Sequence, residues 1–209
     1  MIDSSGSMTN HWWWRPGWRV GRSFYAWHFT FDDQLPMDHL MSHYAAALSA
    51  RKGLDLVSRS GLHLTTQGVG FADEVSASDV GRIVDQARRH CATLTPLAVN
   101  VGPAHIEPET VKMLVLPAEA IIQVRLALRR AIGDVWGESK VPESMANFRP
   151  HVTLAYSNVN GPSGEILAAL EACGPRVERV KIHSVSLIDL NRDHKRYEWS
   201  EVVKVQLGS

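Results

Sequence analysis

The sequence has few cysteines, no excess of charge of either sign and no long apolar run. Its two cysteines, Cys91 and Cys173, lack the close spacing of metal ligands, so we interpret both as buried thiols in a reducing compartment. Twenty-two basic residues balance twenty-two acidic ones. This balance disfavours long contacts with a nucleic-acid backbone, because such binding scales with the number of phosphates neutralised. A nucleotide or an RNA end in a locally positive cleft remains compatible with it.

No stretch is long and apolar enough to span a membrane, so we expect no membrane partner. Residues 1–10 have neither a cationic start nor an apolar run, which argues against a signal peptide and favours the cytoplasm. The 209 residues, 44% of them hydrophobic, suit one large domain or two small lobes that share a core.

A short segment in the second half carries the first chemical signal. Pro150 is followed by alternating residues typical of a β-strand that starts after a fixed turn. Residues two apart on a strand share a face, so His151 and Thr153 point one way while Val152 and Leu154 point into a core. An imidazole and a hydroxyl on one rigid face can move a proton and hold an anionic oxygen.

The same pattern occurs in the first half as His63 and Thr65. Strands and helices are expected to alternate in a similar order around both motifs, although the halves share no other obvious identity. We therefore predict an α+β protein with two similar lobes, each presenting one His-x-Thr strand to a common cleft.

A third His-x-Thr begins at His28, on an aromatic-rich segment that favours a strand. With ten histidines in the chain, about one such pattern is expected by chance. His28 also lacks a similarly placed partner motif. We therefore interpret it as a structural histidine whose ring is satisfied within the fold.

The N-terminal segment differs from the rest of the chain. Residues 1–10 are rich in Ser and Gly and are expected to be disordered, whereas residues 11–18 hold four of the seven tryptophans. These indoles can belong to an arm packed across the domain, can line the cleft and stack on a base, or can form a contact between molecules. We assign residues 1–22 to this arm and residues 23–209 to one bilobal domain.

The remaining pattern predicts the other elements and two details of the helices. Ser78 is the expected N-cap of the helix that ends at Cys91. Arg125, Arg129 and Arg130 are expected on the solvent face of a later helix. Helices are predicted at 36–52, 78–91, 118–132 and 165–172, and strands at 23–31, 54–57, 62–71, 95–101, 111–116, 151–156, 177–190 and 197–207.

Two imidazoles that face each other across a cleft suit in-line displacement at phosphorus. One ring, as general base, takes a proton from the attacking oxygen, and the other, as general acid, protonates the leaving oxygen. Histidine suits both tasks because its ordinary pKa lies near neutrality. The hydroxyls of Thr65 and Thr153 can donate to non-bridging phosphate oxygens. A metal pair would require carboxylates beside the histidines, and neither motif contains Asp or Glu, so we expect no metal.

These residues resemble the signature of the two-histidine (2H) phosphoesterase superfamily, and within it the bacterial RNA 2′,3′-cyclic phosphodiesterases often labelled 2′-5′ RNA ligases. The resemblance extends over residues 24–207 and includes the Phe-x-Pro before His151 and the late segment around Tyr197. It implies two antiparallel sheets lining a central cleft, with helices outside. It further implies that His63 and His151 are the acid–base pair, that Thr65 and Thr153 bind phosphate, and that no cofactor is needed. The expected protein is a monomer that acts on a small nucleotide or an RNA 3′-end.

The sequence departs from this family after each motif. Thr66 stands where an apolar residue is usual, and Ala155-Tyr156 stand where many members carry an arginine, which bears on substrate preference. Tyr156 can contact a base or pack in the fold; we treat it and Phe71 as candidate substrate contacts.

The expected reaction is hydrolysis of a 2′,3′-cyclic phosphate, on an RNA end or a small nucleotide, to a 2′-phosphate. The same two histidines can also cleave a 2′-5′ linkage or a cyclic oligonucleotide, and the sequence does not say which histidine is the base. Ligation in reverse would need aligned RNA ends, which a neutral surface supports poorly. Two other hypotheses are a non-catalytic module that binds nucleotides or RNA ends, and chemistry on another phosphorylated metabolite.

Overall fold

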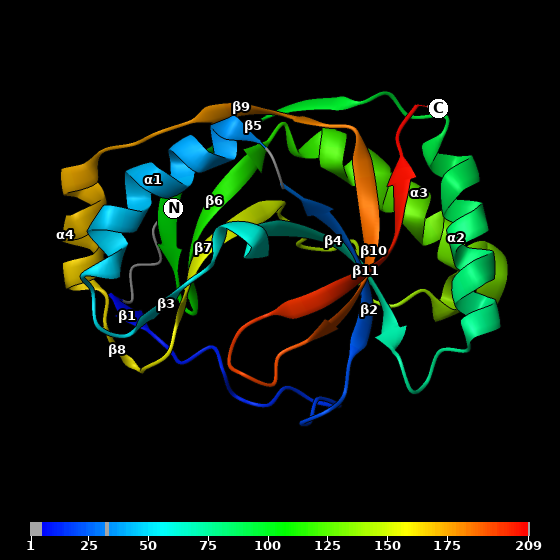
Figure 1. Cartoon of the computed structure of the whole chain (residues 1–209), viewed down its shortest axis with the longest axis horizontal. Coiled ribbons are helices and arrows are strands. Elements are labelled where there is room, and N and C mark those ends of the chain that lie inside the picture. The colour runs from blue at the N-terminus through cyan, green and yellow to red at the C-terminus, as the bar shows by residue number, and fades with distance from the viewer. Residues whose placement is uncertain (1–5, 32–33, 209) are drawn as a thin grey trace.

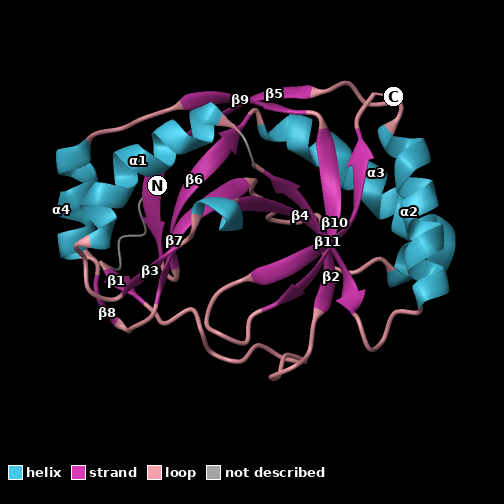
Figure 2. Ribbon diagram, in the orientation of Figure 1, coloured by secondary structure: helices cyan, strands magenta, loops and turns pink. Residues whose placement is uncertain are grey.

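Two antiparallel sheets form the centre of the protein, and four helices lie on their outer sides (Figure 1). The structure is a computed structural model that describes residues 6–31 and 34–208. The helices group in two pairs, one at each end of the molecule, as the ribbon coloured by secondary structure shows (Figure 2). The predicted α+β architecture, with sheets inside and helices outside, is confirmed.

The first sheet has four strands in the order β11-β10-β2-β4. Helices α2 and α3 pack against each other and contact β11 and β4 respectively. The elements of this lobe are β2 (Phe24–Thr30), β4 (His63–Phe71), α2 (Ala77–Cys91), α3 (Ala118–Trp136), β10 (Ser184–Asn191) and β11 (Glu198–Gln206).

The second sheet has five strands in the order β3-β7-β6-β5-β9. Helices α1 and α4 contact each other; α1 contacts β3 and β9, and α4 contacts β5. The elements of this lobe are α1 (Leu35–Ser49), β3 (Leu54–Leu56), β5 (Leu97–Glu107), β6 (Thr110–Leu116), β7 (His151–Ser157), α4 (Gly164–Cys173) and β9 (Glu178–Ile182).

The two lobes are interleaved along the chain and do not correspond to its two halves. Strands β2 and β4 come from the first half, and they complete their sheet with β10 and β11 from the C-terminus. Strand β3 pairs with β7, which is far from it in sequence. Each sheet therefore carries one of the two paired His-x-Thr motifs, β4 in one lobe and β7 in the other, and these two strands contact each other.

Part of the segment expected to be disordered is ordered. Ser7–Met8 form β1, which pairs with β8 (Gly161–Pro162), and the Met8 side chain is buried. Residues 1–5 lie outside the described residues. The expectation of disorder is thus wrong for residues 7–8, because the Met8 side chain packs in the hydrophobic core and the two residues pair with β8.

Four predicted boundaries are corrected. The single strand expected at 177–190 is two strands, β9 and β10, which break at His183 and join different sheets. Strand β5 runs on to Glu107 with a register shift between Val101 and Ala104, and α3 continues to Trp136. The N-cap of α2 is Ser76, not Ser78: its side chain accepts a hydrogen bond from the Asp79 backbone N–H at 3.1 Å. Two short 3₁₀ turns, η1 (Arg59–Gly61) and η2 (Glu138–Lys140), complete the described elements.

One hydrophobic cluster includes buried side chains from both sheets and all four helices. The apolar residues that alternate with the motif residues belong to this cluster. Leu64 on β4, and Val152 and Leu154 on β7, are fully or almost fully buried. Each such side chain contributes about 1.5–3 kcal/mol of transfer free energy. This packing fixes which face of each motif strand points away from the core.

We expected Arg125 on the solvent face of its helix, α3. Instead it is buried, with 3% of its surface exposed. Its guanidinium donates to the backbone oxygens of Thr66 and Ser144 and pairs with the Glu143 carboxylate. It also lies 4.2 Å from the centre of the Phe148 ring. Arg125 therefore ties the loop before His151 to the strand that carries His63. Arg130 is exposed and Arg129 partly so.

Candidate functional site

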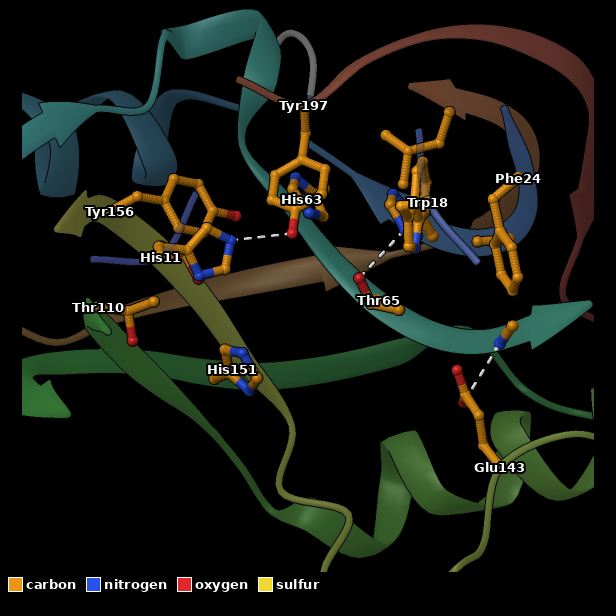
Figure 3. Close-up of a pocket in the computed structure, with 15 residues that line it drawn as sticks. His11, Trp18, Phe24, His63, Thr65, Thr110, Glu143, His151, Tyr156 and Tyr197 are labelled. Atoms are coloured by element: carbon orange, nitrogen blue, oxygen red, sulfur yellow. Dashed lines mark hydrogen bonds between the residues drawn. The ribbon is translucent and has the colours of Figure 1, made fainter. Parts of the chain in front are cut away.

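A cavity of about 350 Å³ lies where the two sheets meet, and both motif strands contribute to its wall. Figure 3 shows His63 and His151 on opposite sides of this space, with Thr65 on the same strand as His63. The lining residues are His11, Trp18, Phe24, Ala26, His28, His63, Thr65, Gly68, Thr110, Glu143, His151, Thr153, Tyr156, Leu190 and Tyr197.

The alternation of each strand places its histidine and threonine in this cavity. On β4, His63 and Thr65 line the wall while Leu64 is buried on the opposite face. On β7, His151 and Thr153 do the same. The structure thus brings together all four residues that the sequence singled out.

Both histidines are held by the same local hydrogen bond. The Nδ1 of His63 lies 2.7 Å from the backbone oxygen of Gly61, and the Nδ1 of His151 lies 2.8 Å from that of Arg149. A carbonyl oxygen can only accept, so each Nδ1 carries a hydrogen and donates it. In the neutral ring this leaves the Nε2 lone pair free, and in the charged ring it leaves an Nε2–H free.

Burial lowers the pKa of both rings. The pKa of His63 falls from 6.5 to about 4, mainly through desolvation; the Gly61 carbonyl opposes the shift and the charge of His151 adds to it. The pKa of His151 is also lowered, mainly by desolvation and further by Lys112, while the Arg149 carbonyl and Glu107 oppose the shift. A bound phosphate anion would raise both pKa values, because an adjacent negative charge favours the protonated ring.

His28 also belongs to this site. It lies on β2 beside β4, and its Nε2 is 3.1 Å from Oγ1 of Thr65. Its ring stacks on that of His63, with centroids 4.5 Å apart and planes 7° apart. Its Nδ1 is buried without a hydrogen-bond partner among the described residues. The prediction that this ring is fully satisfied within the fold is therefore wrong.

The N-terminal arm forms part of the cavity wall. One of the three interpretations of the tryptophan segment was that it lines the cleft. Trp18 lines the cavity, and His11 lines it with 6% of its surface exposed. The other rings of the segment lie elsewhere: Trp12 packs on Tyr156, whereas Trp13 and Trp14 remain about half exposed.

His11 joins the arm to both lobes. Its Nδ1 lies 2.9 Å from the Glu109 carboxylate and its Nε2 lies 2.9 Å from the Tyr197 hydroxyl (Figure 3). Burial, followed by the charge of Arg15, lowers the pKa of His11 to about 4, so the ring is neutral near pH 7. In that state Nδ1–H donates to the carboxylate and Tyr197 O–H donates to Nε2.

Tyr156 replaces the arginine that many members of the resembled family carry after the second motif. It is buried between the rings of His11, Trp12 and Tyr197, and its ring still lines the cavity. The structure thus favours packing as its main role. A buried arginine nearby, Arg192, donates to the backbone oxygens of His11 and Trp13 and holds the arm in place.

Phe71 does not line the cavity. It contacts the rings of Trp18 and Phe24, which do, and the guanidinium of Arg22 lies 3.6 Å from its ring centre. Phe71 is therefore placed behind the wall, where it supports two lining aromatic rings.

Two neighbouring hollows each share three lining residues with the cavity. One, of about 150 Å³, shares His63, Tyr156 and Tyr197 with it. The other, of about 560 Å³, shares Thr65, Glu143 and His151 and is lined by the exposed Arg149 and by Lys112. Further hollows thus adjoin the walls that carry His63 and His151.

Some lining residues had a signal in the sequence and others had none. Phe24, Ala26 and His28 alternate on one strand and share the cavity face, a pattern of period two that could have assigned His28 to the site. His11 and Glu143 lie in irregular segments, where no periodicity indicates direction. Tyr197 stands just before β11, and only the pairing of that strand places it near His63.

Within residues 6–31 and 34–208, no three His, Cys, Asp or Glu side chains are arranged to hold a metal ion. In the same residues, no helix has the length and apolar character needed to cross a membrane.

Several solved structures share this fold. The protein TT0787 of Thermus thermophilus is 20% identical and superimposes with a TM-score of 0.65 over 90% of this chain and 98% of its own. E. coli LigT without ligand is 14% identical, with a TM-score of 0.65 over 90% and 99%. E. coli LigT complexed with 3′-AMP is 15% identical, with a TM-score of 0.64 over the same shares.

No curated protein matches the chain significantly. The model of the 2′-5′ RNA ligase superfamily matches residues 36–194, a span that holds both paired motifs and most of the two sheets. The chain therefore belongs to the 2′-5′ RNA ligase superfamily, within the 2H phosphoesterases.

Proposed function

We propose that the protein is a metal-independent phosphodiesterase that opens 2′,3′-cyclic phosphates, on RNA ends or small nucleotides, to 2′-phosphates. One observation carries the proposal: two histidines with the same Nδ1–H···O=C bond line one cavity from opposite lobes. Each therefore offers its Nε2 for proton transfer.

In the proposed reaction, water attacks phosphorus opposite the 3′-oxygen. One neutral histidine accepts a proton from the water at Nε2 as the P–O bond forms. The other, protonated, donates its Nε2–H to the 3′-oxygen as the P–O3′ bond breaks. The charge on the two rings is exchanged, and protons from solvent restore the starting state.

The threonines complete the arrangement. The hydroxyls of Thr65 and Thr153 donate to the non-bridging oxygens and hold phosphorus between the two rings. The structures of E. coli LigT with 3′-AMP, ATP and phosphate support this assignment, since they show that a protein of the same fold binds such groups.

The test is incubation with 2′,3′-cyclic nucleotides in EDTA, followed by phosphorus NMR. We expect a 2′-phosphate product, and loss of turnover by at least about a hundredfold in His63→Ala and in His151→Ala, the contribution typical of general acid–base catalysis. His90→Ala is the matched control, because His90 pairs with Asp134 on the outer helices. Urea unfolding of each variant verifies the fold.

Other outcomes would redirect the assignment. Binding of nucleotides without turnover would indicate a binding module. Turnover of 2′-5′-linked or cyclic oligonucleotides in preference to cyclic mononucleotides would keep the two histidines and change the substrate. Turnover that survives loss of either histidine would contradict the mechanism.

A further inference from the structure

His28 is a third histidine in the cavity wall and has no place in the two-histidine reaction. It stands on β2 with Phe24 and Ala26 on the cavity face, and its strand partner across the sheet is Thr65. The pairing of β2 with β4 shifts register between Trp27 and His28. At this shift the His28 ring contacts both Thr65, its strand partner, and His63, two residues earlier on β4.

The hydrogen bonds of His28 determine which nitrogen carries its proton. With 1% of its surface exposed and the His63 ring stacked on it, the side chain is neutral: burial lowers its pKa well below the usual 6.5, and His63 lowers it further. One neutral tautomer would place a buried N–H on Nδ1, which has no partner among the described residues. The other leaves only a lone pair there, and a buried orphan N–H is the costlier of the two. The ring therefore carries its hydrogen on Nε2.

This tautomer determines the direction of the Thr65 hydroxyl. Nε2–H of His28 donates to Thr65 Oγ1 over 3.1 Å, so the threonine oxygen is the acceptor in this bond. The hydroxyl hydrogen must then point elsewhere. Thr65 is exposed and lines the cavity, so its hydrogen is available to an oxygen of a bound phosphate.

The stacked ring constrains His63 in a second way. Its plane lies within 7° of the His63 plane at 4.5 Å, while the edge of Trp199 contacts His63 from another side with centroids 5.1 Å apart. Together with the bond to the Gly61 carbonyl, these contacts fix the plane of the His63 imidazole. The direction of its Nε2 is fixed with it.

We propose that His28 is a positioning residue that holds the Thr65 hydroxyl as a donor toward the substrate phosphate and the His63 ring in its reactive plane. This inference rests on the proposed phosphodiesterase function. His28 transfers no proton itself and acts through its two neighbours.

The test is a double-mutant cycle between His28 and Thr65. His28→Phe keeps a flat ring for stacking but removes the donor, His28→Gln keeps an N–H donor, and Thr65→Val removes the hydroxyl with little change of shape. We expect His28→Phe to lower kcat/KM about tenfold to a hundredfold in the Thr65 background, as for loss of a hydrogen bond to a charged group. In the Thr65→Val background it should change kcat/KM by no more than about twofold. His28→Gln should be more active than His28→Phe but less active than wild type, because it restores the donor to Thr65 without the ring that stacks on His63.

A merely structural role gives a different pattern. His28→Phe would then reduce activity equally in both backgrounds, and His28→Gln would be no better than His28→Phe. Either result would overturn the proposal. Nitrogen-detected NMR of the imidazoles provides a readout independent of activity: the Nε2–H tautomer is expected for His28, and the Nδ1–H tautomer would also overturn it.

Binding separates this proposal from the proposed function. The same variants are titrated with adenosine 2′-monophosphate by calorimetry. If the wild type binds it but opens no cyclic phosphate, the phosphodiesterase assignment fails, and the coupling between His28 and Thr65 in Kd still decides the role of His28. If the wild type binds no phosphate ligand, both proposals fail.

Discussion

The hydroxyl of Tyr197 lies 2.9 Å from Nε2 of His11, so that the residue before the last strand is hydrogen-bonded to the N-terminal arm. Both side chains line the cavity, and the opposite nitrogen of His11 is bonded to Glu109. The matched family span begins at residue 36, so His11 lies before it. Part of the cavity wall therefore comes from a segment outside the matched span.

The contact between His11 and Tyr197 should contribute measurably to stability. His11→Phe and Tyr197→Phe each remove the hydrogen bond and keep an aromatic ring, and each is expected to lower the free energy of unfolding by about 1–3 kcal/mol. The double variant should lose less than the sum, with a coupling of about 1 kcal/mol. Urea unfolding of the four proteins measures this. Losses that add up fully would show that the two side chains stabilise the fold independently.

The rate should depend on pH in a direction set by the two buried rings. Catalysis needs one neutral and one protonated histidine. Burial holds the pKa of both rings below 6.5, that of His63 at about 4. The profile of kcat/KM, which reports the free enzyme, should peak between pH 4 and 6.5 and fall as pH rises above the higher pKa. The profile of kcat should lie at higher pH, because the bound phosphodiester anion raises both pKa values.

Steady-state kinetics from about pH 4 to about pH 9 test this, with His90→Ala as a control expected to share the wild-type profile. A kcat/KM that still rises above neutral pH would contradict the role of desolvation.

Arg125 should be required for stability, unlike its exposed neighbour Arg130. Arg125→Met leaves the buried carbonyl of Thr66 and that of Ser144 without this donor, and Glu143 without its cation. We expect a loss of about 3 kcal/mol in the free energy of unfolding. Arg130→Met, the matched control on the same helix, should stay within about 0.5 kcal/mol of wild type. Equal effects of the two substitutions in chemical unfolding would show that burial of Arg125 has no energetic role.

Cys91 should be inert in the folded protein. Its side chain is fully buried, and burial raises the pKa of its thiol to about 11, so almost no thiolate forms at about pH 8. In Cys173→Ser, which isolates Cys91, we expect no reaction with a disulfide reagent at that pH until urea unfolds the chain. Fast labelling of the folded variant would show that the α2 region opens readily.

Much of the fold followed from patterns that act over a few residues. Alternation predicted β4 and β7 and the faces of the two paired motifs, because a strand has the same period wherever it lies. The aromatic-rich composition of residues 23–31 predicted β2. The spacing of apolar residues predicted all four helices within a few positions. Two of the errors arose where a distant partner decided. One is the break at His183, where the chain passes from one sheet to the other. The other is the burial of Arg125, which a carbonyl from β4 and one from the loop before β7 made possible.

The sequence by itself determined that two His-x-Thr strands each turn an imidazole and a hydroxyl away from the core, since strand geometry and apolar neighbours suffice for that. Only the tertiary structure decided that these faces meet in one cavity, and that His11, His28 and Tyr197 join them. The physical reason is the distance along the chain over which each effect acts. A side chain's direction is set by its own strand. Its neighbours are set by which strands pair across the whole chain, and the pairing of β2 with β4 and with β10 has no local signature.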